Sequence, residues 1–490
     1  MSSEVIKGLE PSILWQRFYE ITQVPRPSKK EGKILAHMRN LFKELNISFK
    51  EDKVGNIVAS VPATKGYENS PTVVLQGHVD MVCEKNKETK HDFENDPITM
   101  VRDNGWIKAK GTTLGSDNGI GVAAALAVIT DKNVIHGPVE ILLTIDEETG
   151  LTGATKVEPE FISGKILLNM DSEEDGAFYV GCAGGVDTLG SFNIEFENTP
   201  SGFTSYELMA TGLKGGHSGL DINQGRANGI KILARALVHL SKFDYRIARL
   251  DGGSLRNAIP REAEAIIFLK DSDVKDIEKI IKDVGKTLVN EFKASDSGVK
   301  INLSKIDQTF SKVFTRKFSD KVVNTLFALP HGIIMISRDI PDLVETSTNL
   351  ATIKTDNDKV TIGTSQRSSV ESAKKYIAQS VRSIFSLAGA DIEKTDGYPG
   401  WKPNMDSNIL KISKDVFKNL FNKEPKIKAI HAGLECGILE GKNPGLDMIS
   451  FGPTILGAHS PDERVNIETV GRFYSLLKGI LKELAEQRVN

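Results

Sequence analysis

The sequence predicts an α/β fold in which a mostly parallel sheet is flanked by helices and interrupted by an inserted α+β domain. Three observations support this prediction. Short apolar runs alternate with helix-like stretches over roughly the first 170 residues, a similar run returns near residue 448, and the pattern between 186 and 394 changes to strands paired with helices. The 490 residues exceed what one core usually organises, at about 150 residues per domain.

The expected elements follow in chain order. Residues 12–47 predict helix, because Ile34, Met38, Leu41 and Leu45 recur at helical spacing. A β/α rhythm comes next, with strands expected at 72–75, 139–145, 166–170 and 448–451 and helices at 119–130 and 468–487.

The insertion begins where this rhythm stops. We therefore expect residues 1–185 and 395–490 to be two segments of one domain, and residues 186–394 to form the inserted one. Helices at 225–240 and 318–329, each followed by strands, suggest two related lobes within it. The helix expected at 276–290 contains Gly-Lys-Thr, but Ile280 replaces the first glycine of a phosphate loop, which argues against an ATPase.

Composition excludes several function classes. Lys and Arg number 62 against 65 Asp and Glu, a net charge of -3 with both signs interspersed, so neither nucleic acid nor an anionic membrane is expected as a partner. The longest apolar run, near 120–129, is too short to span a bilayer, and the N-terminus is polar. The three cysteines form no metal or disulfide pattern. A cytoplasmic protein is expected, and a homodimer is compatible with the sequence.

Polar residues gather where the expected strands end. His78 and Asp80 follow one strand, Asp146, Glu147 and Glu148 another, Asp171 a third, and the loop after 448–451 reaches His459; Asp117 begins a helix. Each alone is commonly a helix cap or a solvated loop residue. Ligands bind at the carboxyl ends of strands in open α/β sheets, and imidazole with carboxylate suits zinc.

The motifs HVD, GSDNG, DEE, NMDSE and GAHSPDE occur in an order that resembles the co-catalytic zinc peptidases, a family that includes aminoacylase, peptidase T and peptidase V. The resemblance is strongest to the aminoacyl-histidine (Xaa-His) dipeptidases and covers essentially the whole chain, including LKGGHSGLDINQGRANG and AIHAGLECG. It implies a zinc-peptidase-like catalytic domain with a lid domain inserted in it.

The resemblance also implies a ligand set for two divalent metal ions, zinc first, with cobalt or manganese as alternatives. One ion would be held by His78, Asp117 and Asp171, and the other by Asp117, Glu148 and His459. Asp117 would bridge them, and a cis peptide is expected between Asp117 and Asn118. An aspartate at 171, where deacylases and carboxypeptidases of the family have glutamate, favours substrates with a free amino group.

The resemblance also implies catalytic roles for residues near these ligands. Glu147 would activate water, and Asp80 would orient His78 from behind. Spacing alone leaves open the reverse assignment, with Glu147 as ligand and Glu148 as base. The resemblance further implies that His217, on a mobile lid hinged near 186 and 394, binds the oxyanion, and that Asn257 and Arg367 bind substrate. Glu435 is a candidate for the substrate's ammonium group, with an ordinary loop residue as the alternative.

The resemblance therefore implies a hydrolase of small peptides, a dipeptidase whose substrates include Xaa-His dipeptides such as carnosine. The alternative within the same site is an N-acyl amino acid deacylase or carboxypeptidase. A non-catalytic metal-binding or scaffolding protein is a third possibility, against which Glu147 beside a complete ligand set argues.

Overall fold

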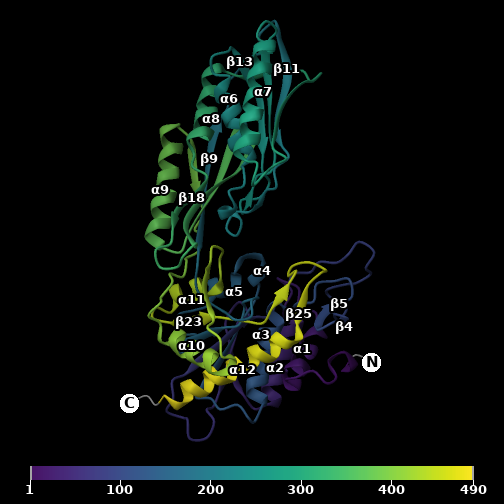
Figure 1. Ribbon diagram of the computed structural model, residues 1–490, viewed down its shortest axis with the longest axis vertical. Helices are drawn as coiled ribbons and strands as arrows, with labels where there is room; N and C mark the ends of the chain where they lie inside the picture. Colours follow the sequence, from purple (N-terminus) through teal and green to yellow (C-terminus); the bar gives the residue numbers. More distant parts are fainter. Residues whose placement is uncertain (1–2, 488–490) are drawn as a thin grey trace. The chain divides into compact units, whose positions relative to one another are not determined.

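The computed structural model describes residues 3–487 and divides the chain into two compact units (Figure 1). Unit 1 comprises the residues up to 181 together with 401–429 and the residues from 434, and unit 2 comprises 182–400 and 430–433. Both units are therefore assembled from segments far apart in the sequence.

Unit 1 is built on an eight-stranded sheet in the order β1-β2-β6-β3-β7-β23-β8-β22. The four central strands, β6, β3, β7 and β23, run parallel. Residues of β3 and β6 are buried along the whole strand, as expected where helices cover both faces. The strands are β1 (Ser48–Glu51), β2 (Ile57–Val61), β3 (Val73–His78), β6 (Val139–Thr144), β7 (Ile166–Asn169), β8 (Ala177–Cys182), β22 (Lys426–Ile430) and β23 (Asp447–Ser450).

Helices pack on this sheet, and a smaller four-stranded sheet, β24-β25-β5-β4, accompanies it. The small sheet contains β4 (Met100–Asp103), β5 (Trp106–Ala109), β24 (Ile455–Leu456) and β25 (Arg464–Asn466). The helices are η1 (Ser3–Ile6), α1 (Ser12–Thr22), α2 (Gly32–Glu44), α3 (Ser116–Thr130), α4 (Glu147–Gly150), α5 (Thr152–Lys156), α10 (Asn408–Phe421), α11 (Glu435–Lys442) and α12 (Ile467–Glu486).

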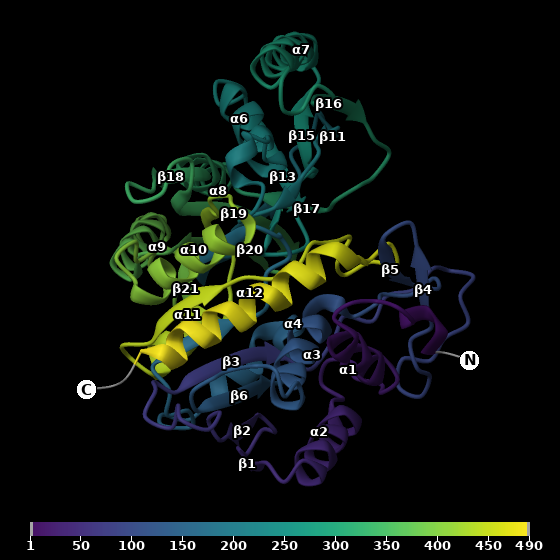
Figure 2. The same ribbon diagram turned by 60° about the horizontal axis from the view of Figure 1, so that its bottom comes forward.

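Two helices illustrate how the sequence sets their positions. Helix α3 consists mainly of small apolar residues and is buried on nearly every side, where it contacts α1 and β3. Helix α12 is amphipathic, begins at the Asn466 cap, and crosses unit 1 beside α10 (Figure 2).

The helix expected over 12–47 is confirmed only in part. The structure has α1, a non-helical segment and α2 there, and α2 ends before β1 begins. Pro25 and Pro27 lie in the non-helical segment, and proline lacks the N–H that a helix interior requires.

Unit 2 contains a nine-stranded antiparallel sheet in the order β16-β11-β15-β13-β19-β20-β9-β21, with β18 also paired to β19. Only two residue pairs join β13 to β19, so the sheet narrows at that point. Its strands are β9 (Gly184–Asn193), β11 (Phe203–Thr211), β13 (Tyr245–Gly252), β15 (Ala263–Lys270), β16 (Lys300–Lys305), β18 (Gly332–Ile336), β19 (Val344–Asp356), β20 (Lys359–Ser368) and β21 (Asp391–Lys394).

Helices of unit 2 pack against this sheet, and their apolar faces form its main core with residues such as Leu233, Phe318 and Phe385. The helices are η2 (Ile222–Gln224), α6 (Gly229–His239), α7 (Val274–Glu291), α8 (Arg316–Ala328) and α9 (Glu371–Leu387). Two short ribbons, β10 (Phe196–Asn198) with β17 (Lys312–Phe314) and β12 (Gly216–His217) with β14 (Ala258–Ile259), complete the unit. The predicted fold class, a mostly parallel helix-flanked sheet with a separate α+β domain, is confirmed.

Candidate metal centre and catalytic site

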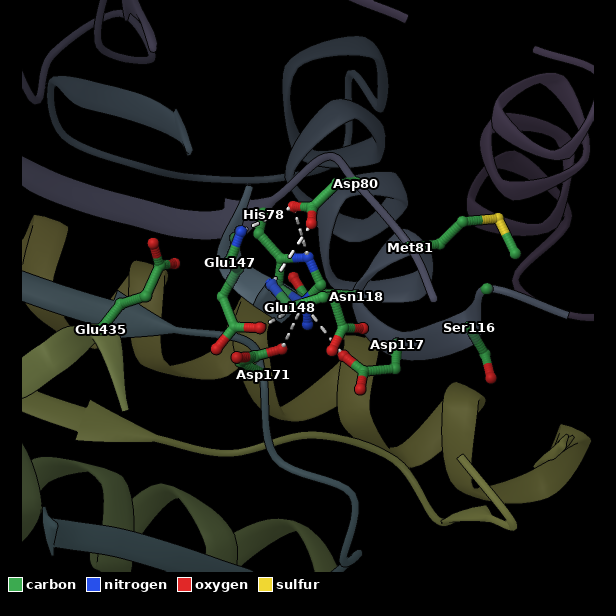
Figure 3. Close-up of polar contacts among 12 residues, drawn as sticks. His78, Asp80, Met81, Ser116, Asp117, Asn118, Glu147, Glu148, Asp171 and Glu435 are labelled. Carbon is green, nitrogen blue, oxygen red and sulfur yellow. Dashed lines mark hydrogen bonds and ion pairs between the residues drawn. The ribbon is translucent and has the colours of Figure 1, made fainter. Parts of the chain in front are cut away.

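Strand ends, a helix start and a loop of unit 1 bring the predicted ligands together, and Figure 3 shows His78, Asp117, Glu148 and Asp171 among them. Strand β3 ends at His78, β7 is followed by Asp171, and the turn after β6 leads into α4, which begins with Glu147 and Glu148. Parallel neighbours end at the same edge of the sheet, so these side chains from distant segments converge there.

Asp117 lies between the two imidazoles. Its Oδ1 is 3.0 Å from Nε2 of His78, and its Oδ2 is 3.1 Å from Nε2 of His459. Each carboxylate oxygen thus faces one ring nitrogen, an arrangement suited to a carboxylate shared by two cations. The peptide between Asp117 and Asn118 is cis, which confirms the sequence prediction, and the Asn118 side-chain amide donates to the Met170 carbonyl at 2.6 Å.

Two sets of three ligand atoms share Asp117. In one set Nε2 of His78 lies 3.4 Å from Oδ1 of Asp171, and in the other Nε2 of His459 lies 3.0 Å from Oε2 of Glu148. Within each set the ligand atoms lie within 4.8 Å of one another. Oε1 of Glu148 is buried without a hydrogen-bond partner among the described residues, and Oδ1 of Asp171 has only the long 3.4 Å contact with His78. Buried carboxylate oxygens without donors fit a site that binds cations.

Asp80 supports this cluster from behind. Its Oδ1 lies 3.3 Å from Nδ1 of His78, and its carboxylate accepts hydrogen bonds from the backbone N–H groups of Glu147 and Glu148 and from the Ser28 hydroxyl. Although burial opposes ionisation, His78 and these donors lower the pKa of Asp80 to about 2. The Asp80 carboxylate beside Nδ1 orients the His78 ring so that Nε2 faces the ligand cluster.

Burial and crowding of like charges control the other carboxyl groups. Burial raises the pKa of Asp171 to about 7, and it raises the pKa of Glu147 well above its usual value, with Asp171 and Glu435 adding to the effect. Hydrogen bonds to Asp117 and Glu148 raise the pKa of His459 to about 11.

The sequence interpretation did not assign Glu463, although this residue belongs to the quoted GAHSPDE motif. Its carboxylate accepts hydrogen bonds from four consecutive N–H groups, those of residues 114–117, and from the Ser116 hydroxyl. Glu463 is 2% exposed and lies four residues after His459, so it joins the loop of Asp117 to that of His459. The sequence feature that could have identified Glu463 is its position four residues after His459 in the same motif.

Arg26 supports the same loops from the N-terminal segment. Its guanidinium donates to the backbone carbonyls of Val79, Asp80 and Gly115. A cluster of three buried carboxylates, those of Glu31, Asp80 and Asp146, accepts hydrogen bonds from neighbouring backbone and hydroxyl groups, so it organises loops.

Glu435, at the start of α11, is fully buried near Glu147 (Figure 3). One carboxylate oxygen accepts hydrogen bonds from Gln76 at 2.5 Å and Thr144 at 2.8 Å, and the other, Oε1, has no partner among the described residues. Burial raises the pKa of Glu435 to about 7.

The remaining candidates, His217, Asn257 and Arg367, lie in unit 2. His217 in β12 pairs with Ala258 in β14, and the N–H of Ser218 donates to the Asn257 carbonyl at 2.8 Å, so His217 and Asn257 belong to one short ribbon. Arg367 in β20 places Nε 3.4 Å from the Ser218 hydroxyl. All three residues therefore gather in one region of unit 2.

Nδ1 of His217 accepts hydrogen bonds from the N–H groups of Gly219 and Leu220, at 3.2 and 3.0 Å. The neutral ring consequently carries its proton on Nε2. Burial and Arg367 lower the pKa of His217, which favours this neutral form.

Comparison with known proteins places the chain in a family. Residues 74–483 match peptidase family M20/M25/M40. Cytosol non-specific dipeptidase of Escherichia coli (strain K12) is 42% identical over 480 residues, which cover 98% of this chain and 99% of the relative.

Solved structures of other peptidases resemble the fold of this chain. The crystal structure of aminoacylhistidine dipeptidase from Vibrio alginolyticus has a TM-score of 0.91 and 42% identity, covering 99% of both chains. Aminopeptidase PepT from Bacillus cereus ATCC 10987 shares the fold. Its TM-score is 0.58, with 18% identity over 97% of this chain and 99% of that one. Across residues 3–487 we find no helix with the length and apolar character to cross a membrane. From the extent of the family match, the chain belongs to peptidase family M20/M25/M40.

Proposed function

We propose that this protein is a cytoplasmic metal-dependent dipeptidase that hydrolyses dipeptides with a free amino terminus, Xaa-His dipeptides included. The observation that carries this proposal is the pair of histidine–carboxylate groups that share Asp117. The relatives named cytosol non-specific dipeptidase and aminoacylhistidine dipeptidase support the same activity, since each aligns over nearly the whole chain.

Two divalent ions, zinc in our proposal, would be held by the two sets described above. His78, Asp117 and Asp171 would bind one, and Asp117, Glu148 and His459 the other. Two such ions lower the pKa of water, polarise a scissile carbonyl and stabilise negative charge. The unpartnered Oε1 of Glu148 supports this assignment, because a cation would take the place of the missing donor.

Glu147 would act as the base. It would accept a proton from the attacking water and return it to the departing amine, for which its raised pKa is suitable. Its Oε2 is 4.0 Å from Nε2 of His78, whereas Glu148 lies 3.0 Å from His459. Glu148 also belongs to the group that contains Asp117 and His459, whereas Glu147 groups only with His78 and Glu148, so we assign Glu148 as the ligand and Glu147 as the base.

We assign the lid role to residues 186–394, with 1–185 and 395–490 as the catalytic domain. His217 would donate its Nε2–H to the oxyanion, and the backbone bonds that hold its Nδ1 support that role. Asn257 would bind the substrate backbone beside His217. The unpartnered Oε1 of Glu435 supports this residue as the acceptor of the substrate's ammonium group.

Arg367 would bind the free carboxylate of the dipeptide. Its side chain is buried, with 7% of the residue exposed, yet no ion pair of the described residues includes it. A buried guanidinium without a carboxylate partner favours an anionic ligand.

The test is a panel of dipeptides, their N-acetyl forms and longer peptides, offered to the purified protein with zinc, cobalt or manganese. A dipeptidase cleaves the free dipeptides and loses that activity after chelation, with recovery when the metal returns. Faster cleavage of the N-acetyl forms would instead support the deacylase or carboxypeptidase alternative.

A further inference from the structure

Tyr398 is a hydrogen-bond partner of Arg367 in unit 2. Nη1 of Arg367 donates to the Tyr398 hydroxyl at 2.8 Å, a shorter contact than the 3.4 Å from Nε to the Ser218 hydroxyl. The guanidinium thus has two neutral oxygen acceptors and, among residues 3–487, no ion-pair partner. Its charge is oriented without being neutralised.

The Tyr398 ring is held in one place. Its backbone N–H donates to the Gly185 carbonyl at 2.9 Å, and its carbonyl accepts from Nζ of Lys374 at 2.6 Å. The ring lies between two glycines, because a Cβ added to Gly185 would come within 2.8 Å of Cζ and one added to Gly433 within 2.9 Å of Cε2. Glycine at both positions therefore makes room for this ring.

The phenol also has a proton to donate. Its oxygen accepts from Arg367, and its own O–H has no hydrogen-bond acceptor among the described residues. Burial raises the pKa of Tyr398, so the hydroxyl keeps its proton at neutral pH. The guanidinium and the O–H group are side by side, which matches the two oxygens of one carboxylate.

We propose that Tyr398 is a substrate-binding residue that holds Arg367 in position and donates its own O–H to the C-terminal carboxylate of the dipeptide. This inference rests on the proposed function and deepens it: the enzyme would require a free carboxylate because two groups recognise it. A C-terminal amide would bind more weakly, since it has no negative charge to interact with Arg367.

The experiment compares one dipeptide with its C-terminal amide on the parent enzyme and on Tyr398→Phe. For the free dipeptide we expect kcat/KM of the variant to fall roughly 10- to 100-fold, mainly through KM, because one hydrogen bond to a charged group is lost. For the amide the change should stay within about threefold, since a neutral hydrogen bond is weaker. The preference for the free carboxylate therefore shrinks.

Tyr245→Phe is the matched control. This tyrosine is buried in unit 2, its hydroxyl has no hydrogen bond among the described residues, and its ring stacks on Arg316. The control should leave both substrates unchanged. In an Arg367→Met background, Tyr398→Phe should have little further effect on the preference, because both residues act on the same carboxylate.

The outcomes distinguish failure of the role of Tyr398 from failure of the proposed function. An equal loss on both substrates, or an unchanged preference, in Tyr398→Phe would overturn the role of Tyr398 while leaving the dipeptidase proposal in place. A parent enzyme that cleaves dipeptide and amide equally well would overturn the carboxylate site as a whole. A parent enzyme that cleaves neither would contradict the proposed function itself.

Discussion

The two units differ in the chemistry that they present. Unit 1 gathers carboxylates and imidazoles at the ends of parallel strands, where Asp117 lies between His78 and His459. Unit 2 has an antiparallel sheet and presents hydrogen-bond donors instead, such as Nε2 of His217 and the guanidinium of Arg367. In our proposal, unit 1 binds the cations and transfers protons, and unit 2 recognises negative charge on the substrate.

The largest effect is expected from a unit 1 residue that binds no cation in our proposal. Glu147→Ala should lower kcat by roughly 10²–10⁴-fold while the metal content stays near that of the parent, because the base contacts water. Metal analysis alongside steady-state kinetics measures both quantities. Loss of one metal in this variant, with both kept in Glu148→Ala, would reverse the two assigned roles.

A smaller effect is expected from the donor in unit 2. His217→Ala should lower kcat by roughly 10²–10³-fold, with little change in KM or metal content, since an oxyanion donor acts mainly in the transition state. His239→Ala, an exposed histidine in α6 of the same unit, is the control and should behave like the parent. A fully metallated His217→Ala enzyme that turns over at the parent rate would contradict the proposed oxyanion role of His217.

The smallest effect concerns the support of the metal ligands. Glu463→Ala removes the acceptor of the N–H groups of residues 114–117, so the orientation of Asp117 should loosen. Metal affinity should fall by roughly 10–100-fold, as is typical when a group behind a ligand is lost. Metal-buffered titration measures this, and Glu468→Ala, on the exposed start of α12, serves as control. Unchanged affinity would mean that the loop keeps its shape without Glu463.

The sequence by itself determined the fold class and the candidate residues of unit 1. Buried apolar strands and polar strand ends are local patterns, so residue order alone was enough to locate β3, β6 and β7 and to single out His78, Asp117 and Asp171. The helix expected over 12–47 is interrupted because Pro25 and Pro27 lack the N–H groups that a continuous helix requires.

Only the tertiary structure decided which groups meet. The contact of Glu463 with residues 114–117 joins positions almost 350 apart in the chain, and no local pattern reports such a pairing. The same holds for Tyr398 beside Arg367, where the ring depends on the absence of side chains at Gly185 and Gly433. Residue type and spacing show which chemistry a side chain can perform. The packing of distant segments determines which donors remain unpartnered and therefore available to a ligand.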